Sequence, residues 1–202
     1  IHPSSNNADE NYLNQSFYQT LTWDRTFAKK HSLSAMAGTS YNNFNTINFS
    51  SHVEGYFDNE LTDLNAGSTL PSVTGQITKN IIMSYLGRLN YGFADKYLLE
   101  ATFRYDGSSR FASNRRWGFF PAVSAAWRID KENFLEDVPF IDLLKLRGSW
   151  GKMGNQDAVN LYSYLNTVNL GYDYTFANNI SSGAAIVAYN DPNITWETTT
   201  TY

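Results

Sequence analysis

The sequence has no cysteine, few charged residues and no long apolar run, and each of these absences excludes a class of protein. Without cysteine the chain has neither a disulfide framework nor a cysteine-based zinc motif. No run reaches the ~18 apolar residues of a transmembrane helix, so any membrane-spanning part must consist of strands. Charged residues make up 17% of the sequence, against about 25% of a typical soluble domain. The net charge is −4 and basic residues form no stripe, so no nucleic-acid partner is predicted.

Aromatic residues are abundant, with 14 Tyr, 13 Phe and 5 Trp, and two of them bracket a strand predicted at residues 97–106. Its odd positions are Tyr97, Leu99, Ala101, Phe103 and Tyr105, and its even positions are Leu98, Glu100, Thr102, Arg104 and Asp106. This alternation predicts a strand with one apolar and one polar face. An aromatic residue at both ends of an apolar band of about 9–11 residues is typical of a strand that crosses a bilayer.

Similar alternation predicts six further strands, at residues 13–23, 31–41, 81–93, 117–128, 144–150 and from about 195 onward. Residues 1–11 are predicted to be the end of a loop. Pro121 predicts a bulge, because proline cannot donate to a strand ladder. The connections alternate in length, at 24–30, 42–79, 94–96, 106–116, 129–142 and 153–193, and 129–142 is predicted to hold a short helical turn. Outer-membrane barrels have short periplasmic turns and long outer loops, so outer loops are predicted at about 42–79 and 153–193.

Large aromatic residues on the apolar faces gather at the strand ends. Those beside the short connections are Trp23, Tyr91, Tyr97 and Trp127, and those beside the longer ones are Tyr41, Tyr105, Trp117 and Trp150. Two such groups predict aromatic girdles at the two lipid interfaces of a membrane. The predicted fold is therefore all-β, an antiparallel transmembrane β-barrel segment within which residues 1–202 form part of a single domain. Because seven strands cannot close a bacterial single-chain barrel, we expect this chain to be an internal piece of a longer protein.

Four segments of the sequence resemble the β-barrel of the SusC/RagA family of TonB-dependent outer-membrane transporters. They are SYLGRLNYGFADKYLLEATFRYDGSSRF (84–111), NRRWGFFPAVSAAWRI (114–129), LKLRGSWGKMGNQ (144–156) and DPNITWETTT (191–200). The motifs are long and follow one another closely, so the likeness over residues 84–202 is specific. Residues 1–83 fit as preceding strands but carry little of the signature.

The resemblance implies a 22-stranded barrel in the bacterial outer membrane, with an N-terminal plug that couples to TonB. It also implies a SusD-like surface lipoprotein that closes over the barrel mouth, and a substrate that is a glycan or oligosaccharide, or a peptide. Neither the plug nor the TonB-binding segment is recognisable in these residues. The expected role of this chain is therefore the barrel portion of a TonB-dependent importer that takes up such substrates.

The charged residues on the polar strand faces are candidates for lining the barrel lumen: Arg88, Glu100, Arg104, Arg128, Lys145 and Arg147. One interpretation is that they pair with one another or with a plug, since opposite charges on neighbouring strands stabilise a barrel interior. The other is that they form a polar surface along a substrate path. The sequence favours the first interpretation and does not exclude the second.

Aromatic residues in the two long loops are candidates for contacts with a substrate or a partner protein: Tyr56, Phe57, Tyr162, Tyr164, Tyr172 and Tyr174. Aromatic rings stack on sugar faces and on protein surfaces with little loss of side-chain entropy. Alternatively, the loops fold on themselves or extend strands beyond the membrane.

Residues for catalysis, for a metal or for a cofactor are not recognisable, and none of these functions is predicted. The three histidines have no ligand spacing, and the segment 106–110 lacks the spacing of a phosphate-binding loop. Asp58, Glu60 and Asp63 do not match a calcium-binding loop. Two alternatives to the importer stay open, a soluble carbohydrate-binding β-sandwich and another outer-membrane barrel such as an adhesin.

Overall fold

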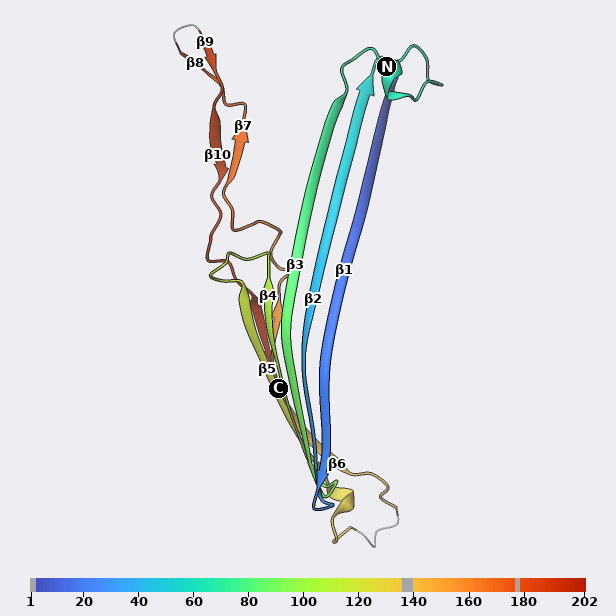
Figure 1. Ribbon diagram of the computed structural model, residues 1–202, viewed down its shortest axis with the longest axis vertical. Coiled ribbons are helices and arrows are strands. Elements are labelled where there is room, and N and C mark those ends of the chain that lie inside the picture. Colours follow the sequence, from blue (N-terminus) through green and yellow to red (C-terminus); the bar gives the residue numbers. More distant parts are fainter. Residues whose placement is uncertain (1–2, 136–139, 177–178) are drawn as a thin grey trace. The chain divides into compact units, whose positions relative to one another are not determined.

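The computed structural model describes residues 3–135, 140–176 and 179–202, and most of them belong to one seven-stranded sheet (Figure 1). In sheet order its strands are β1 (Ser4–Phe27), β2 (His31–Glu54), β3 (Ser72–Phe93), β4 (Tyr97–Ser108), β5 (Trp117–Arg128), β6 (Lys145–Asn155) and β11 (Glu197–Thr201). Two small sheets pair β7 (Thr167–Leu170) with β10 (Ala184–Ala188) and β8 (Tyr174–Phe176) with β9 (Asn179–Ser181). Among the described residues no helix is long and apolar enough to cross a membrane.

The chain divides into two compact units, which we call the smaller unit (residues 1–16 and 42–80) and the larger unit (residues 17–41 and 81–202). Strands β1, β2 and β3 contribute to both. In the larger unit, β4 and β5 have 12 residues each and β6 has 11. These lengths match the ~9–11 residues of a tilted strand that crosses a bilayer once. In contrast, β1 and β2 have 24 residues each and β3 has 22.

Two hairpins of the larger unit close through turns of the same sequence type, Phe–Ala–x–Lys, at residues 27–30 and 93–96. The central residues all have positive φ: Ala28 46°, Lys29 56°, Ala94 51° and Asp95 54°. The Lys30 N–H donates to the Phe27 carbonyl at 3.2 Å, and the Lys96 N–H donates to the Phe93 carbonyl at 2.9 Å. Positive φ at both central residues twists the turn in the sense that matches the strands it joins. These tight turns keep β1 next to β2 and β3 next to β4.

The register of β4 is continuous with its neighbours on both sides. Leu99 stands opposite Tyr91 of β3 and Ala125 of β5. Pro121 stands opposite Phe103 without a bulge, so the predicted bulge is wrong. On its other side, the pairing of β5 with β6 begins at Ala122, one residue past Pro121. The proline therefore sits where its missing N–H removes no bond from the ladder between β5 and β6.

The apolar face of the sheet stays exposed in the larger unit, because no shared core covers it. Leu99 is 52% exposed, Phe103 45% and Val123 49%. The buried apolar side chains of the described residues are few: Val53, Tyr56, Phe111 and Phe120. A soluble sandwich would bring its apolar faces together in one core. The predicted fold class, an antiparallel β-barrel segment, is confirmed.

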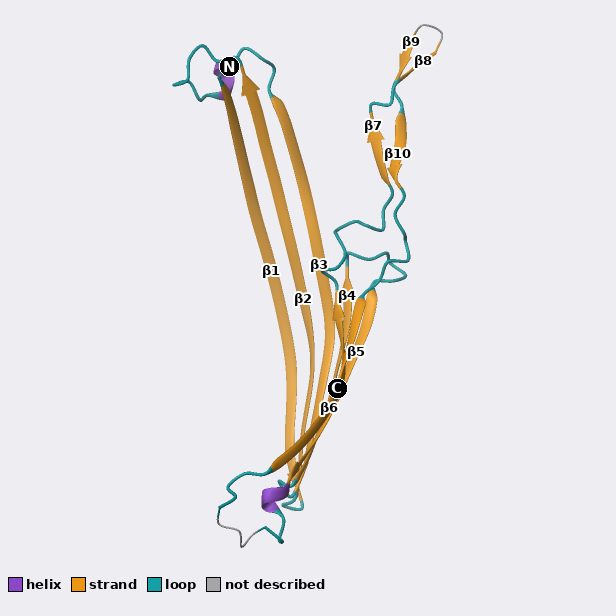
Figure 2. Cartoon of the chain, turned by 180° about the vertical axis from the view of Figure 1, so that it is seen from behind, coloured by secondary structure: helices purple, strands orange, loops and turns teal. Residues whose placement is uncertain are grey.

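The structure differs from the prediction mainly at the long connections. Strand β1 already begins at Ser4, and β2 and β3 extend into the predicted loop 42–79, leaving a connection at 55–71 with a 3-10 turn, η1 (Leu64–Ala66). The predicted loop 153–193 contains β7 to β10. Among the described residues, Figure 2 shows helix in η1 and in η2 (Ile129–Lys131), and η2 lies in the predicted helical turn. Of that segment, residues 136–139 lie outside the described residues.

Candidate functional site

The polar face of the larger unit contains a recess of about 400 Å³ near the ends of the strands that adjoin the short turns. It contains three of the predicted lumen residues, Glu100, Lys145 and Arg147, together with Asp24 and Arg25. The register explains why Glu100, Lys145 and Arg147 meet, because residues on one face of neighbouring strands stand side by side. Glu100 is opposite Asn90 and Ser124, and Ala126 is opposite Arg147. The recess therefore presents carboxylates and cations on one wall.

The six predicted lumen residues do not pair with one another. Arg104 donates from Nε to Asp106 Oδ2 at 3.2 Å, and Arg128 donates from Nη2 to Asp130 Oδ2 at 2.6 Å. The bond from Arg128 is the main reason why the pKa of the Asp130 carboxyl is lowered to about 2. Within the described residues the other four, Arg88, Glu100, Lys145 and Arg147, form no ion pair. Pairing within the set is therefore wrong, and pairing with a plug stays a prediction.

A row of aromatic rings crosses four strands of the larger unit beside the short turns. The ring centroids of His31 and Phe93 are 4.9 Å apart, those of Phe93 and Tyr97 6.3 Å, and those of Tyr97 and Trp127 6.4 Å. His31 Nδ1 lies 2.8 Å from the Tyr91 hydroxyl. We call this group of five residues the turn-side row. It includes three of the predicted girdle residues, and the fourth, Trp23, lies 6.3 Å from Phe27.

Glu132, which follows η2, joins the turn-side row to the turn between β3 and β4. The indole N–H of Trp127 donates to Glu132 Oε1 at 3.0 Å, and the Tyr97 hydroxyl donates to the same oxygen at 2.7 Å. Lys96 Nζ donates to Oε2 at 3.0 Å. These three bonds lower the pKa of Glu132 to about 2. The sequence did not single out Glu132, because two of its three partners, Lys96 and Tyr97, lie about 35 residues earlier in the chain.

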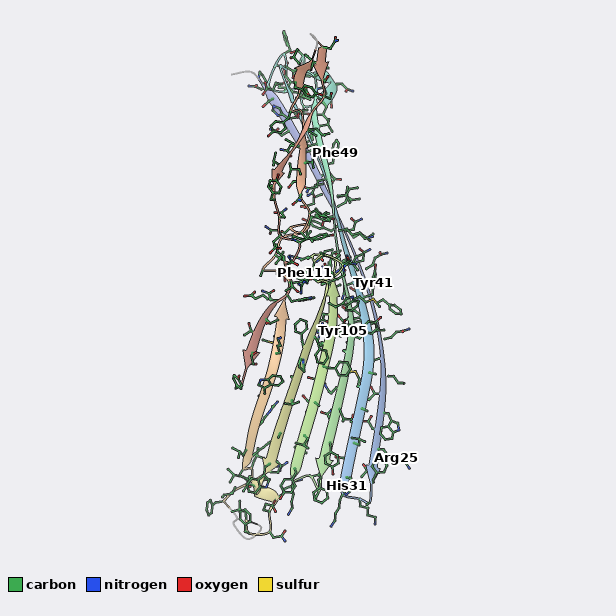
Figure 3. The ribbon with its side chains drawn as sticks, turned by 90° about the vertical axis from the view of Figure 1, so that its left-hand side faces the viewer. Arg25, His31, Tyr41, Phe49, Tyr105 and Phe111 are labelled. Atoms are coloured by element: carbon green, nitrogen blue, oxygen red, sulfur yellow. The ribbon has the colours of Figure 1, made fainter. Side chains whose placement is uncertain are left out.

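A second group of aromatic rings lies toward the other end of β4. The Trp117 ring stacks on Tyr105 at 4.8 Å and on Tyr85 at 5.9 Å. We call Tyr85, Tyr105 and Trp117 the loop-side row. Figure 3 shows His31 beside the short turns, and Tyr41 and Tyr105 further from these turns along the strands. Of the girdle residues predicted beside the longer connections, Tyr105 and Trp117 belong to this row, whereas Trp150 stands opposite Val123, which stands opposite Ala101 of β4. Tyr85 was not among the predicted girdle residues.

A buried aromatic cluster lies next to the loop-side end of the sheet. Phe111 is fully buried and Phe120 is 7% exposed, and each ring centroid lies 5.2 Å from that of Trp196. The indole N–H of Trp196 donates to the Arg116 carbonyl at 2.9 Å. The three rings come from three of the four segments that carry the family resemblance. The alternation pattern could not find them, because Phe111 and Trp196 lie outside the strands.

Arg110 joins the loop before β5 to the start of the connection after β6. Its Nη2 lies 2.9 Å from Asp157 Oδ1, and its Nη1 donates to the Val159 carbonyl at 2.7 Å. At the far end of that connection, the Thr195 hydroxyl donates to the Arg115 carbonyl at 3.2 Å. Both ends of the segment 157–195 are therefore held by the loop at 109–116.

The predicted loop aromatics differ widely in exposure. In the smaller unit Tyr56 is 5% exposed, whereas the adjacent Phe57 is 96% exposed. In the larger unit Tyr162, Tyr172 and Tyr174 are exposed and Tyr164 is half-buried. Tyr56 is therefore a packing residue in this chain, and the other five offer contact surface.

Comparison with known proteins relates these features to one family. The family model described as TonB dependent receptor-like, beta-barrel, matches residues 2–202. The TonB-dependent receptor SusC of Bacteroides thetaiotaomicron is 43% identical over 132 residues, which are 64% of this chain and 13% of SusC. A TonB-dependent receptor of Formosa agariphila is 33% identical over 195 residues, which are 93% of this chain and 18% of that receptor.

Solved structures give the same result at the level of the fold. The RagAB peptide transporter superposes with a TM-score of 0.85 at 25% identity, over 96% of this chain and 21% of the transporter chain. The RagAB peptide importer in its open-open state superposes with a TM-score of 0.87 at 24% identity. The superposition covers 98% of this chain and 21% of the importer chain. This chain thus spans about a fifth or less of the length of the relatives it matches.

Proposed function

Because this chain belongs to the TonB dependent receptor-like β-barrel family, we propose that it is part of the wall of an outer-membrane importer. TonB-dependent receptors are outer-membrane β-barrel proteins, and the importer draws its energy from TonB through a plug that lies outside residues 1–202. One observation carries the proposal. The same sheet has an exposed apolar face between two aromatic rows and, on its other side, a polar face with unpaired charges.

The apolar face contacts lipid, and the aromatic rows mark the two interfaces. Phe103, Leu99 and Val123 lie between the turn-side row and the loop-side row along β4 and β5. Aromatic girdles on either side of an apolar band are the usual arrangement in outer-membrane barrels. The short turns then face the periplasm, and the connections at 55–71, 109–116 and 156–196 face outward. Trp23, Tyr41 and Trp150 belong to the same girdles.

The polar face lines the lumen, and its unpaired charges serve as a polar surface along the substrate path or meet the plug. The substrate is an oligosaccharide or a peptide, and the likeness to the RagAB peptide transporter supports the peptide as one of the two classes. A SusD-like lipoprotein closes the outer mouth, with Phe57, Tyr162, Tyr164, Tyr172 and Tyr174 as candidate contacts. The relatives are receptors and transporters, which supports a role without catalysis.

The transport step is tested in cells that express the full-length protein. Uptake of labelled oligosaccharides and labelled peptides is compared in cells with and without TonB. Uptake that requires both this protein and TonB supports the proposal, whereas uptake that continues unchanged without TonB contradicts it.

The orientation of the sheet is tested by single-cysteine labelling. Residues 1–202 contain no native cysteine, so an introduced cysteine is the only thiol of this segment that can react. Leu99→Cys and Glu100→Cys are adjacent but lie on opposite faces of β4. In the full-length protein freed of other cysteines, a small water-soluble reagent should label Glu100→Cys and spare Leu99→Cys, which reacts with a lipid-soluble reagent. Equal labelling of both positions by the water-soluble reagent would contradict a lipid-facing apolar side.

A further inference from the structure

The two hairpin turns of the larger unit share one sequence type and one backbone conformation, but they differ in how their charges are neutralised. Around the turn between β3 and β4, three basic side chains pair with three carboxylates. The pairs are Lys96 with Glu132 at 3.0 Å, Lys131 with Asp95 at 3.7 Å and Arg128 with Asp130 at 2.6 Å. The charges around this turn therefore cancel.

The turn between β1 and β2 has basic residues without such partners. Lys29 and Lys30 belong to the turn itself, and Arg25 lies near the end of β1. All three are exposed, and within the part of the chain that the structure describes none of them forms an ion pair. Asp24 is the single carboxylate of residues 23–31, so this segment has three basic residues, one acidic residue and a net charge of +2. It can attract an anion that the other turn cannot.

An aromatic ring holds the charged group of Arg25 beside β1. Its Cζ lies 5.1 Å from the centroid of the Phe27 ring, and the Phe27 ring lies 6.3 Å from that of Trp23. Trp23, Arg25 and Phe27 are alternate residues of one strand, so their side chains leave from one face. Arg25 also borders the recess of the polar face, but its guanidinium lies over Phe27. A guanidinium over a ring keeps the N–H groups at its edge available for an acceptor.

The position of this group along the strands decides which anion it meets. Figure 3 shows Arg25 and His31, a member of the turn-side row, at the same end of the strands. In the proposed function this row marks the periplasmic interface, and aromatic rings at such an interface lie at the level of the lipid headgroups. Arginine and lysine bind phosphate oxygens through charge-assisted hydrogen bonds. The phosphate of a lipid headgroup therefore lies within reach of the unpaired cations.

Other anionic partners fit these surroundings less well. A substrate or a plug meets the polar face of the sheet, whereas the guanidinium of Arg25 lies beside Trp23 and Phe27, whose side chains are 46% and 39% exposed. An acidic protein segment would have to enter the lipid interface to cover these rings. A glycerophospholipid satisfies both features, because its phosphate meets the cations and its acyl chains meet the rings.

We propose that Arg25, Lys29 and Lys30 form a binding site for the phosphate of an anionic glycerophospholipid in the periplasmic leaflet, with Trp23 and Phe27 against its apolar part. The site anchors the first hairpin to the lipid layer, whereas the second hairpin is held by ion pairs within the protein. The inference goes beyond the proposed function and rests on it for the orientation of the sheet in the membrane.

Lipid binding is measured by native mass spectrometry of the full-length protein in detergent, titrated with dioleoyl phosphatidylglycerol. Arg25→Gln with Lys29→Gln should weaken binding of the first lipid molecule about thirtyfold, since each basic residue near a membrane surface contributes about fivefold. The matched control, Arg147→Gln with Lys145→Gln, removes the same two charges from the polar face at the same end of the strands. It should leave the lipid affinity unchanged. Equal effects of the two double variants, or no effect of either, overturn the proposal.

A single substitution keeps the test decisive where the double variant does not fold. Lys29→Gln changes one exposed side chain of the turn and should weaken binding of the lipid about fivefold. Its TonB-dependent uptake should equal that of the native protein, which shows that the variant is folded. An unchanged lipid affinity in this folded variant overturns the part of Lys29 in the site.

Three further probes separate the lipid from other sources of negative charge. Dioleoyl phosphatidylcholine has the same acyl chains without a net charge and should bind more weakly than phosphatidylglycerol, and equal binding would overturn an anionic lipid as the ligand. Glycerol phosphate has no acyl chain, and binding as tight as that of the lipid would identify a site for a soluble phosphate. Binding of a hexaglutamate peptide that is lost in the double variant would identify an acidic protein partner. Either of these two results overturns the proposal.

Failure of the lipid site is distinct from failure of the proposed function. Labelling of Leu99→Cys by the water-soluble reagent would show that the apolar face is not in lipid, which is a failure of the proposed orientation. If Leu99→Cys is spared and the double variant binds phosphatidylglycerol as tightly as the native protein does, the lipid site alone is wrong.

Discussion

The two units of this chain share strands β1, β2 and β3 but differ in what their side chains meet. In the larger unit, one face of the sheet is apolar at nearly every second position, as Tyr97, Leu99, Phe103 and Tyr105 show along β4. In the smaller unit polar and apolar residues mix on one face, and Asp9 and Asn11 alternate there with Leu13. Period-two alternation is required where lipid covers one face, but not where water reaches both.

Charge separates the two units as well. Of the net charge of −4, the smaller unit contributes −5 and the larger unit +1. The difference arises because 14 of the 15 basic residues belong to the larger unit, whereas the smaller unit has six acidic residues and one lysine. A strand can therefore be longer than the part that alternates between apolar and polar residues. In this chain β1, β2 and β3 stay paired in the smaller unit, where that alternation has ended.

The largest expected effect contrasts two phenylalanines, one from each unit. Phe111 of the larger unit is fully buried against Trp196, whereas Phe57 of the smaller unit is 96% exposed. Phe111→Ala should destabilise the full-length protein by about 3–5 kcal/mol, because it leaves a cavity in a closed cluster. Phe57→Ala should change the free energy of unfolding by less than about 0.5 kcal/mol. Denaturant unfolding in detergent measures both, and equal effects would contradict the buried cluster.

A charge placed on the outer face of each unit tests where the membrane ends. Leu99→Arg should cost about 2–4 kcal/mol of folding free energy in lipid vesicles, the value for arginine near the bilayer midplane. Phe49→Arg in the smaller unit should cost about 0–1 kcal/mol, the value near or beyond the interface. Urea titration of the refolded full-length protein provides both numbers. A cost at Phe49 as large as that at Leu99 would place the smaller unit in lipid too.

The sequence predicted the strand segments that have one apolar face, and it missed the strand segments that are rich in polar residues. Strand β4 and the short turns were predictable because period-two alternation marks a strand with one apolar face, whereas the assignment of the aromatic residues to girdles stays a prediction. The halves of β2 and β3 in the smaller unit were not predictable, since Asn, Ser and Thr give no apolar period, and pairs such as Ser50 with Thr74 depend on register. The same holds for the candidate sites. Glu100, Lys145 and Arg147 were found by alternation, whereas Glu132 depends on contacts between distant segments.

A smaller effect contrasts one glutamate from each unit. Glu132 of the larger unit accepts hydrogen bonds from Trp127, Tyr97 and Lys96, whereas Glu54 of the smaller unit is 56% exposed and contacts His52. Glu132→Gln should lower the melting temperature of the full-length protein at pH 7, because a neutral amide is a weaker acceptor than the carboxylate. Glu54→Gln should leave it unchanged.

The pH dependence of the Glu132 effect has a defined sign. The pKa of Glu132 is lowered from 4.5 to about 2 in the folded protein. Its contribution is therefore fully present above pH ~4.5 and is lost as the pH falls toward ~2. The melting temperatures of the native protein and of Glu132→Gln should differ at pH 7 and pH 5, differ less at pH 3, and converge only at about pH 2 and below. A difference that stays constant with pH would show that the carboxylate charge has no part in the effect.

The smallest effect contrasts two glycines in open surroundings, Gly148 of β6 and Gly75 of β3. An added methyl group would meet no atom within 4 Å at Gly148 and only the Asn48 carbonyl oxygen, at 3.7 Å, at Gly75. Neither glycine has a positive φ, so alanine fits the backbone at both.

Both Gly148→Ala and Gly75→Ala should stabilise the protein by about 0.4–1 kcal/mol, because alanine reduces the conformational freedom of the unfolded chain. Gly148 stands opposite Ala125 on the apolar face, so its new methyl group also enters lipid, which adds up to about 0.8 kcal/mol. Parallel urea titrations in vesicles measure the difference between the two variants. If lipid covers only the larger unit, Gly148→Ala should stabilise the protein more than Gly75→Ala does. Equal stabilisation by the two substitutions would mean that both positions face the same surroundings, lipid or water.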